Sequence, residues 1–230
     1  MRGYINTTEI RMYAAFVLIL LPTAALCYKG YLSLGTINST WLMIILLLIL
    51  AGSFIEIPIA RIRSRKPEQL TRYAPVLEDI YSVPIVKELN IGKQRVFDTT
   101  LTMNIGGAVI PALATIYLLL TQPNNTALQI MLIVVVGAIL LSEMRAGVGI
   151  IIPGYIGLIA VPFSLIIDPE NAAVVTFIAG VGGILIGNAI SALTFNRERT
   201  GSAFISIGGA GSFRAIYVTT IIAALVSYFI

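Results

Sequence analysis

Apolar residues occur along this chain in seven long runs, separated by shorter polar segments. Each run approaches the roughly 20 residues that a helix needs to cross the hydrocarbon core of a bilayer. The runs cover residues 12–32, 41–60, 99–120, 127–142, 147–167, 172–195 and a last stretch that ends at Ile230. The pattern predicts an all-α, polytopic transmembrane helix bundle with about seven crossings, in which residues 1–230 form a single transmembrane domain.

Glycine and proline inside these runs predict broken or bent helices. Gly106, Gly107 and Pro111 interrupt the third run, and a Gly- and Pro-containing stretch from 147 to 157 interrupts the fifth. Residues 201–211 either begin the seventh helix or form a separate re-entrant segment. Discontinuous helices are typical of transporters, in which they expose backbone groups to ions or substrates.

The composition excludes the soluble classes of protein. Of the 230 residues, 57% are hydrophobic and 11% are charged, whereas a soluble domain carries roughly 25% charged residues. The lipid bilayer is therefore the first partner that the sequence predicts. The net charge of +4 gives no support for nucleic-acid binding, because the basic residues are distributed as a membrane topology requires.

Thirteen of the 15 basic residues fall on one side of the predicted topology. Eight of them lie in the segment 61–98, and the others lie in the N-terminus and in two further loops on the same side. Because basic loops stay in the cytoplasm, we expect a multi-pass protein of the plasma membrane with a cytoplasmic N-terminus. The glycosylation sequons at Asn38 and Asn124 then lie outside the cell.

The segment 61–98 is too short to bury a core of its own. Its basic cluster from Arg61 to Lys66 either anchors the second crossing at anionic headgroups or forms a dedicated lipid-binding site. Apolar residues between Tyr73 and Leu89 are interrupted by Pro75 and Pro84. They predict short helices that lie at the membrane surface.

Two residue counts limit the chemistry of the chain. It has no His and a single cysteine, Cys27, which excludes Ser/His/Asp or Cys/His catalysis, His-ligated zinc or haem, and an internal disulfide. We expect no cofactor, no metal site and no catalytic residue.

Four helices place their most polar residue at one shallow, cytoplasmic depth. These residues are Glu56, Asn104, Asn188 and Arg214. Ionisable residues in a membrane are costly and indicate functional sites, so we expect a polar cluster, or vestibule, in which Glu56 and Arg214 compensate each other's charge. The alternative is that both charged side chains reach the headgroups while the asparagines bond a neighbouring helix.

Small residues indicate two further features. One face of the sixth run carries a small residue at every fourth position and predicts close helix packing; its members are Ala179, Gly183, Gly187 and Ser191. Gly208, Gly209 and Gly211 predict a flexible segment before the last helix. A helix that begins near Gly211 would direct its positive dipole end into the cluster and favour an anion beside Arg214.

Three segments carry a family resemblance: NIGGAVIP at 104–111, GGILIGN ending at Asn188, and SIGGAGSFRAIYVTTIIAALV at 206–226. Over roughly residues 50–230 the chain resembles the domain of unknown function 1614 family of prokaryotic integral membrane proteins. The resemblance implies no established activity. The family commonly has aspartate at the positions of Asn188 and Arg214, and two such aspartates would suggest a presenilin-like intramembrane protease.

This chain lacks both aspartates, so the resemblance implies an inactive member if the family is proteolytic. If the family instead moves or senses a solute, the change favours an anion over a cation. We therefore expect a non-catalytic membrane protein, either a transporter-like unit or a subunit of a membrane assembly, with other membrane subunits or a homo-oligomer as partners. The alternative is a degenerate intramembrane aspartyl protease that binds transmembrane helices.

Overall fold

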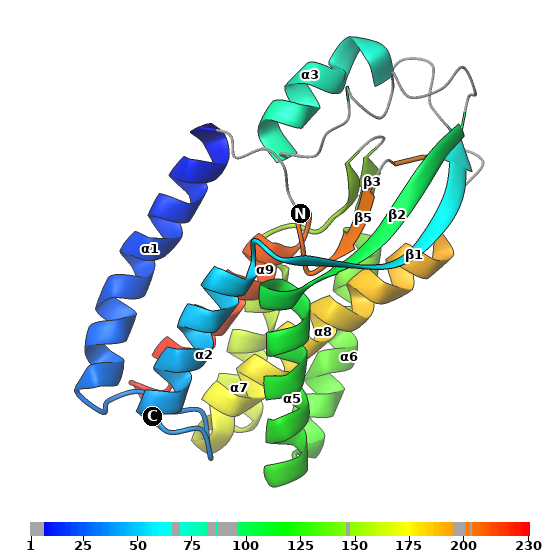
Figure 1. Cartoon of the computed structure of the whole chain (residues 1–230). Helices are drawn as coiled ribbons and strands as arrows, with labels where there is room; N and C mark the ends of the chain where they lie inside the picture. Colours follow the sequence, from blue (N-terminus) through cyan, green and yellow to red (C-terminus); the bar gives the residue numbers. More distant parts are fainter. Residues whose placement is uncertain are drawn as a thin grey trace.

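The chain folds into a bundle of helices with a small sheet at one end (Figure 1). The computed structural model describes residues 7–65, 70–81, 86, 96–145, 148–195, 201–202 and 204–230. Its helices are α1 (Thr7–Tyr28), α2 (Ser39–Gly52), α3 (Leu70–Tyr81), α5 (Ile110–Thr121), α6 (Asn125–Leu140), α7 (Ala160–Ile167), α8 (Ala172–Thr194) and α9 (Phe213–Val226). A π-helical turn, η1 (Ile105–Val109), precedes α5, and the 3-10 turns η2 (Ile156–Ile159) and η3 (Pro169–Asn171) flank α7.

Helix α8 is the centre of the bundle. Its residues from Ala172 to Ile184 are all buried, because α5, α6, α7 and α9 pack around it (Figure 1). Helix α1 stands at the side of the bundle and docks through Phe16, whose ring lies 5.0 Å from that of Tyr217 and 5.9 Å from that of Phe213. The core therefore lies between α8 and its neighbours, while α1 contributes one face.

Three strands form the main sheet, in the order β1–β2–β5. Strand β1 (Glu56–Arg65) pairs antiparallel with β2 (Val96–Asn104), and β2 pairs parallel with β5 (Phe204–Ile207). A second sheet pairs β3 (Glu143–Arg145) with β4 (Gly149–Ile151). The all-α prediction is therefore wrong in part: the chain is mostly helical but contains sheets.

The strands replace helix in four of the predicted crossings. The run 41–60 divides into α2, which ends at Gly52, and β1, which begins at Glu56. Isoleucine occupies every second position from Ile55 to Ile59, the period of a strand, and the pattern shifts by one position at the register irregularity between Pro58 and Ala60. Pro58 lies in an edge strand, where a missing N–H is tolerated. Likewise, the runs 99–120 and 147–167 and the last run each contain a strand before a helix.

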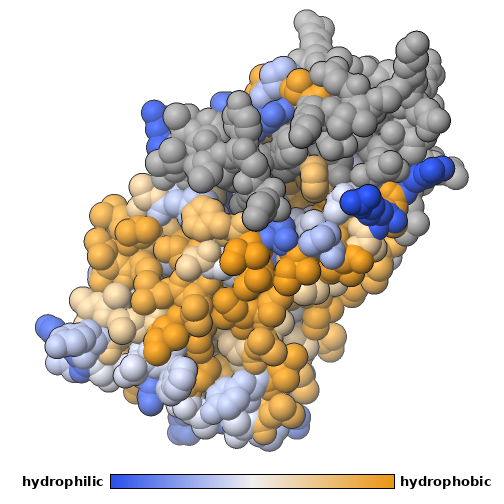
Figure 2. All heavy atoms as spheres, viewed as in Figure 1, coloured by the Kyte–Doolittle hydropathy of each residue, from blue (hydrophilic) through white to orange (hydrophobic). Residues whose placement is uncertain are grey.

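The seven-crossing bundle is not confirmed. Among the described residues, two helices are long and apolar enough to cross a membrane, Arg11–Tyr28 and Pro169–Thr194, and five apolar helices are shorter. In the segment 61–98, α3 is a helix and the two ends belong to β1 and β2, while 66–69, 82–85 and 87–95 lie outside the described residues. Apolar side chains cover much of the helical part on the face in Figure 2.

Candidate functional site

The carboxylate of Glu56 lies at the edge of the main sheet where β1 begins and where β2 and β5 end. Its Oε2 accepts hydrogen bonds from Thr102 Oγ1 at 2.6 Å and from Ser206 Oγ at 2.7 Å. Its Oε1 accepts a hydrogen bond from Asn104 Nδ2 at 3.1 Å. Three uncharged side chains from β2 and β5 thus surround one half-buried carboxylate. We call these four residues the Glu56 site.

Strand register places the Glu56 site on one face of the sheet. Glu56 is the antiparallel partner of Asn104, and Thr102 is the parallel partner of Ser206. Alternate residues of a strand share a face, so Thr102 and Asn104 point to the same side of β2. The same register directs Ser206 and Glu56 to that side.

Asn104 joins the sheet to the helices. Its side chain is fully buried, and its Nδ2 also donates to the carbonyl of Ser53, just after α2, at 2.7 Å. Its Oδ1 accepts from the N–H of Gly107 at 2.7 Å and so caps η1. The amide therefore uses both ends, which is how a buried polar side chain avoids a desolvation penalty.

The glycines beside the Glu56 site are required by close packing. A Cβ on Gly209 would lie 1.9 Å from Ser206 Oγ and 2.5 Å from Glu56 Oε1, and a Cβ on Gly107 would lie 1.9 Å from the carbonyl oxygen of Gly208. Gly208 also has a φ of +75°, which glycine adopts without strain. Whether the predicted flexible segment of Gly208, Gly209 and Gly211 moves stays a prediction.

Asn188 lies on α8 and contacts the far end of the same glycine loop. Its Nδ2 donates to Ser212 Oγ at 2.7 Å, and both residues are fully buried. Its Oδ1 has no hydrogen-bond partner among the described residues. Asn188 therefore joins the Ser212 end of the loop to α8, while Ser206 and Glu56 lie close to Gly209.

Arg214 lies apart from the Glu56 site. It is in the first turn of α9, is exposed, and its Nη2 lies 3.7 Å from Met12 Sδ of α1. Within the described part of the chain, no ion pair joins Arg214 to Glu56. The charge compensation predicted from the sequence is therefore not found, because Arg214 extends toward α1. The position of a polar residue along an apolar run gives its depth in the membrane but not the direction of its side chain. That direction depends on how the helices pack.

Sequence analysis missed Thr102, Ser206 and Ser212. Serine and threonine are common in membrane helices and carry no charge. Because their segments were interpreted as helix, these residues did not stand out as candidates for a functional site. The alternation of apolar and polar residues in TLTMN at 100–104 and in ISI at 205–207 was the usable signal, because it predicts strands that place Thr102 and Ser206 on one face.

The chemistry of the Glu56 site suits a proton or a small hard cation. Carboxylate and hydroxyl oxygens are ligands that such cations prefer. Among the described residues, no group of three or more His, Cys, Asp or Glu side chains could hold a metal ion. The four residues of the Glu56 site include one carboxyl group, that of Glu56, and positions 188 and 214 are Asn and Arg.

A second group of polar residues joins the start of α6 to the end of α7. Asn124 Nδ2 donates to Asp168 Oδ2 at 2.6 Å, and Asn171 Nδ2 donates to Asp168 Oδ1 at 3.0 Å. The hydrogen bond from Asn124, followed by that from Asn171, lowers the pKa of Asp168 below its ordinary value of 3.8. Asn124 and Asn38, the two sequon residues, also cap α6 and α2 through their Oδ1 atoms.

The small-residue face of α8 lies against α6. A Cβ on Gly183 would be 2.6 Å from Val134 Cβ, and one on Gly187 would be 2.6 Å from Ala138 Cβ. At the end of the face, Ser191 Oγ lies 3.0 Å from Ser142 Oγ. Ala179, the first member, is fully buried.

These observations describe a mostly helical chain whose described residues include two helices that could cross a membrane, and a carboxylate site where three strands meet the helices. Residues 50–226 match the family model described as "Protein of unknown function (DUF1614)", and the chain belongs to this family, as the SIGGAG segment and its neighbours predicted. No curated protein and no solved structure matches the chain.

Proposed function

We propose that this chain is a non-catalytic, multi-pass membrane protein that acts as a transporter-like unit, and that Glu56 takes up a positive charge near the cytoplasmic face. The observation that carries the proposal is the contact of one half-buried carboxylate with the side chains of Thr102, Ser206 and Asn104. The carboxylate of Glu56 and the hydroxyl oxygens of Thr102 and Ser206 suit a proton or an alkali cation, while Asn104 Nδ2 donates to Glu56 Oε1.

The apolar surface supports the membrane part of the proposal. Large apolar side chains on several helices are open to the surroundings, among them Leu18 at 69%, Leu120 at 78% and Ile166 at 79%. Exposed apolar surface on this scale marks a membrane or protein contact. The basic residues of β1, Arg61 and Arg63, lie at the sheet end, and the positive-inside rule assigns that end to the cytoplasm.

The broken helices support the transporter-like part. Helices α5 and α9 are short, and each follows a strand and an irregular turn at the Glu56 site. Transporters hold substrates and coupling ions where helices are interrupted, because backbone and side-chain groups converge there. The interruptions of this chain converge on a carboxylate, which favours a cation over the anion that Arg214 suggested.

The hydroxyls of Thr102 and Ser206 allow two states of the site. In the state described above, both hydroxyls donate to the carboxylate. A hydroxyl oxygen also has two lone pairs. Rotation about the C–O bond would turn the hydrogen away and direct a lone pair toward a bound cation. On protonation, Glu56 itself becomes a donor, and one neighbouring hydroxyl can accept from it. The same hydroxyls can therefore bond the ionised and the protonated form of the Glu56 carboxyl group.

Flux into liposomes tests the proposal. The purified chain is reconstituted in vesicles that contain a pH-sensitive dye, and internal pH is followed after an external acid pulse, with and without an opposing Na⁺ or K⁺ gradient. We expect wild-type vesicles to acidify faster than empty ones and Glu56→Gln to return the rate to the empty-vesicle level. Glu143→Gln, at an exposed carboxylate, is the matched control.

Equal rates for Glu56→Gln and wild type would overturn the role of Glu56. A wild-type rate equal to that of empty vesicles under every gradient would overturn the transporter-like function.

A further inference from the structure

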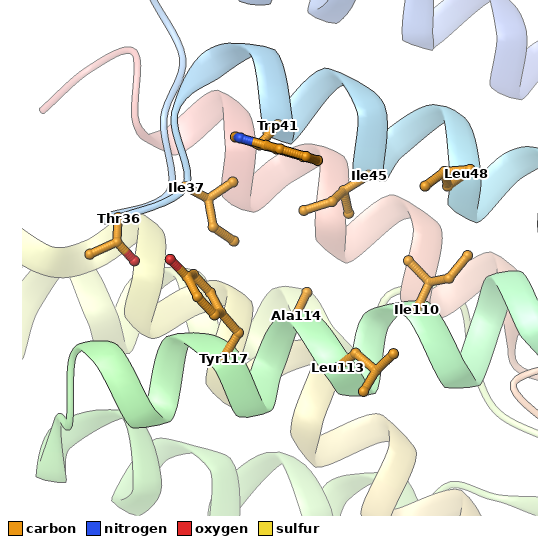
Figure 3. Close-up of a pocket in the computed structure, with 9 residues that line it drawn as sticks. All are labelled: Thr36, Ile37, Trp41, Ile45, Leu48, Ile110, Leu113, Ala114 and Tyr117. Atoms are coloured by element: carbon orange, nitrogen blue, oxygen red, sulfur yellow. The ribbon is translucent and has the colours of Figure 1, made fainter.

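A groove of about 460 Å³ runs between α2 and α5. Figure 3 shows that side chains from both helices face one another across it, with Trp41 on α2 and Tyr117 on α5 near one end and Leu48 and Leu113 toward the other. The groove is open to the surroundings, since Trp41 is 61% and Leu113 is 62% exposed. Its size is within the usual range of small-molecule pockets.

The polar atoms of the groove lie at one end. Thr36, Trp41 and Tyr117 contribute hydroxyl groups and an indole N–H where α2 begins and α5 ends (Figure 3). Toward the other end the lining is aliphatic and includes Ile45, Leu48 and Leu113. Trp and Tyr prefer the headgroup level of a bilayer, where one part of the ring is apolar and the other is wet. The groove thus complements a molecule with one polar end and one long apolar part.

The groove is elongated along the two helices. Trp41 and Leu48 are seven residues apart on α2, which corresponds to about 10.5 Å along the axis. Over this length the lining changes from aromatic and hydroxyl side chains to the aliphatic side chains of Ile45, Leu48 and Leu113. A phospholipid changes in the same order, from its headgroup and ester to the methylene groups of an extended acyl chain.

We propose that the groove binds one acyl chain of a membrane phospholipid, with the ester and headgroup at the Trp41 and Tyr117 end. The inference rests on the membrane part of the proposed function and is independent of Glu56. Its partner is a bound lipid that occupies a defined site between α2 and α5, in addition to the lipids that surround the whole chain.

Trp41 is the single tryptophan of the chain, so its fluorescence reports directly on the groove. Phosphatidylcholine brominated on its acyl chains is added to the delipidated protein in detergent, at a lipid-to-detergent ratio low enough to make random contacts rare. We expect quenching that saturates near one lipid per protein. Ala114→Phe, which fills the floor of the groove, is expected to weaken the apparent affinity at least tenfold.

Leu132→Phe on α6 is the control, because Leu132 is 62% exposed and lies outside the groove; it should bind as wild type does. Ala114→Val is a smaller filling for the case in which Ala114→Phe does not fold, and it should weaken binding in the same direction. Glu56→Gln should leave the quenching unchanged. A failure of the lipid inference can therefore be distinguished from a failure of the proposed role of Glu56.

Two outcomes would overturn the inference. The first is quenching that rises linearly with lipid and is the same in wild type and both Ala114 variants. The second is a disulfide-linked dimer of a Leu113→Cys variant in membranes together with unsaturable quenching, which would make this face a contact between two copies of the chain. Cys27, the native cysteine, is buried and does not interfere.

Discussion

Asn104 and Glu56 are register partners at the end of the β1–β2 pair, and the amide of Asn104 donates to the carboxylate of Glu56 at 3.1 Å. The same amide bonds the carbonyl of Ser53 and the N–H of Gly107. One side chain therefore connects the end of α2, both strands and the start of the α5 segment. This connection explains why a polar residue occupies a fully buried position.

Replacing Asn104 should destabilise the chain strongly. Asn104→Ala leaves the Ser53 carbonyl and the Gly107 N–H buried without their partner, and each such loss costs about 1–3 kcal/mol. We expect an unfolding free energy lower by about 2–4 kcal/mol, measured by denaturant titration in detergent micelles. Asn125→Ala, at the exposed first residue of α6, should change it by less than about 0.5 kcal/mol. Equal effects of the two variants would contradict the connecting role of Asn104.

The contact between Gly107 and Gly208 should not tolerate a side chain. In Gly107→Ala the new Cβ would lie 1.9 Å from a backbone oxygen, which cannot move as the end of a side chain can. We expect a loss of about 3 kcal/mol or more, or failure to accumulate in the membrane. Gly137→Ala is the matched control, since its nearest neighbour would be Ile156 Cδ1 at 3.3 Å and alanine favours helix. Thermal melting of both purified variants measures the difference.

A glycine–alanine exchange tests the contact between α8 and α6. Gly187→Ala places its Cβ 2.6 Å from Ala138 Cβ and should destabilise the chain. Adding Ala138→Gly removes the obstructing atom, so the double variant should recover stability beyond the sum of the single effects, apart from about 1 kcal/mol for glycine in a helix. A double-mutant cycle of unfolding free energies measures the coupling. Strict additivity would show that the two helices do not meet at these residues.

The hydrogen bonds to Asp168 predict a loss of stability in acid. Because they lower the pKa of Asp168 below 3.8, the ionised carboxyl stabilises the fold above that pH, and the contribution is lost as the pH falls through the folded-state pKa. The melting temperature of wild type should therefore fall more steeply below about pH 4 than that of Asp168→Asn. Glu170→Gln, in the same loop, should retain the wild-type slope. Identical slopes for wild type and Asp168→Asn would contradict the assignment.

The Glu56 site could be predicted from the sequence in part. Depth along the apolar runs indicated Glu56 and Asn104, and the structure brings these two together. The prediction of a Glu56–Arg214 ion pair failed because a one-dimensional pattern contains no direction for a side chain. Thr102 and Ser206 were missed because taking their segments as helix concealed the strand alternation that aligns them with Glu56.

The amino-acid sequence by itself determined the family and the apolar character of the chain. Long apolar runs with few charges leave too few polar side chains to cover a water-facing surface whatever the fold, and the SIGGAG segment with its neighbours identified the family. The tertiary structure alone decided where helix changes to strand and which polar residues meet. Strands β1, β2 and β5 come from distant parts of the chain, and β2 is stabilised by hydrogen bonds to both neighbours. Pairing of this kind is a property of the assembled fold, so no local pattern contains it.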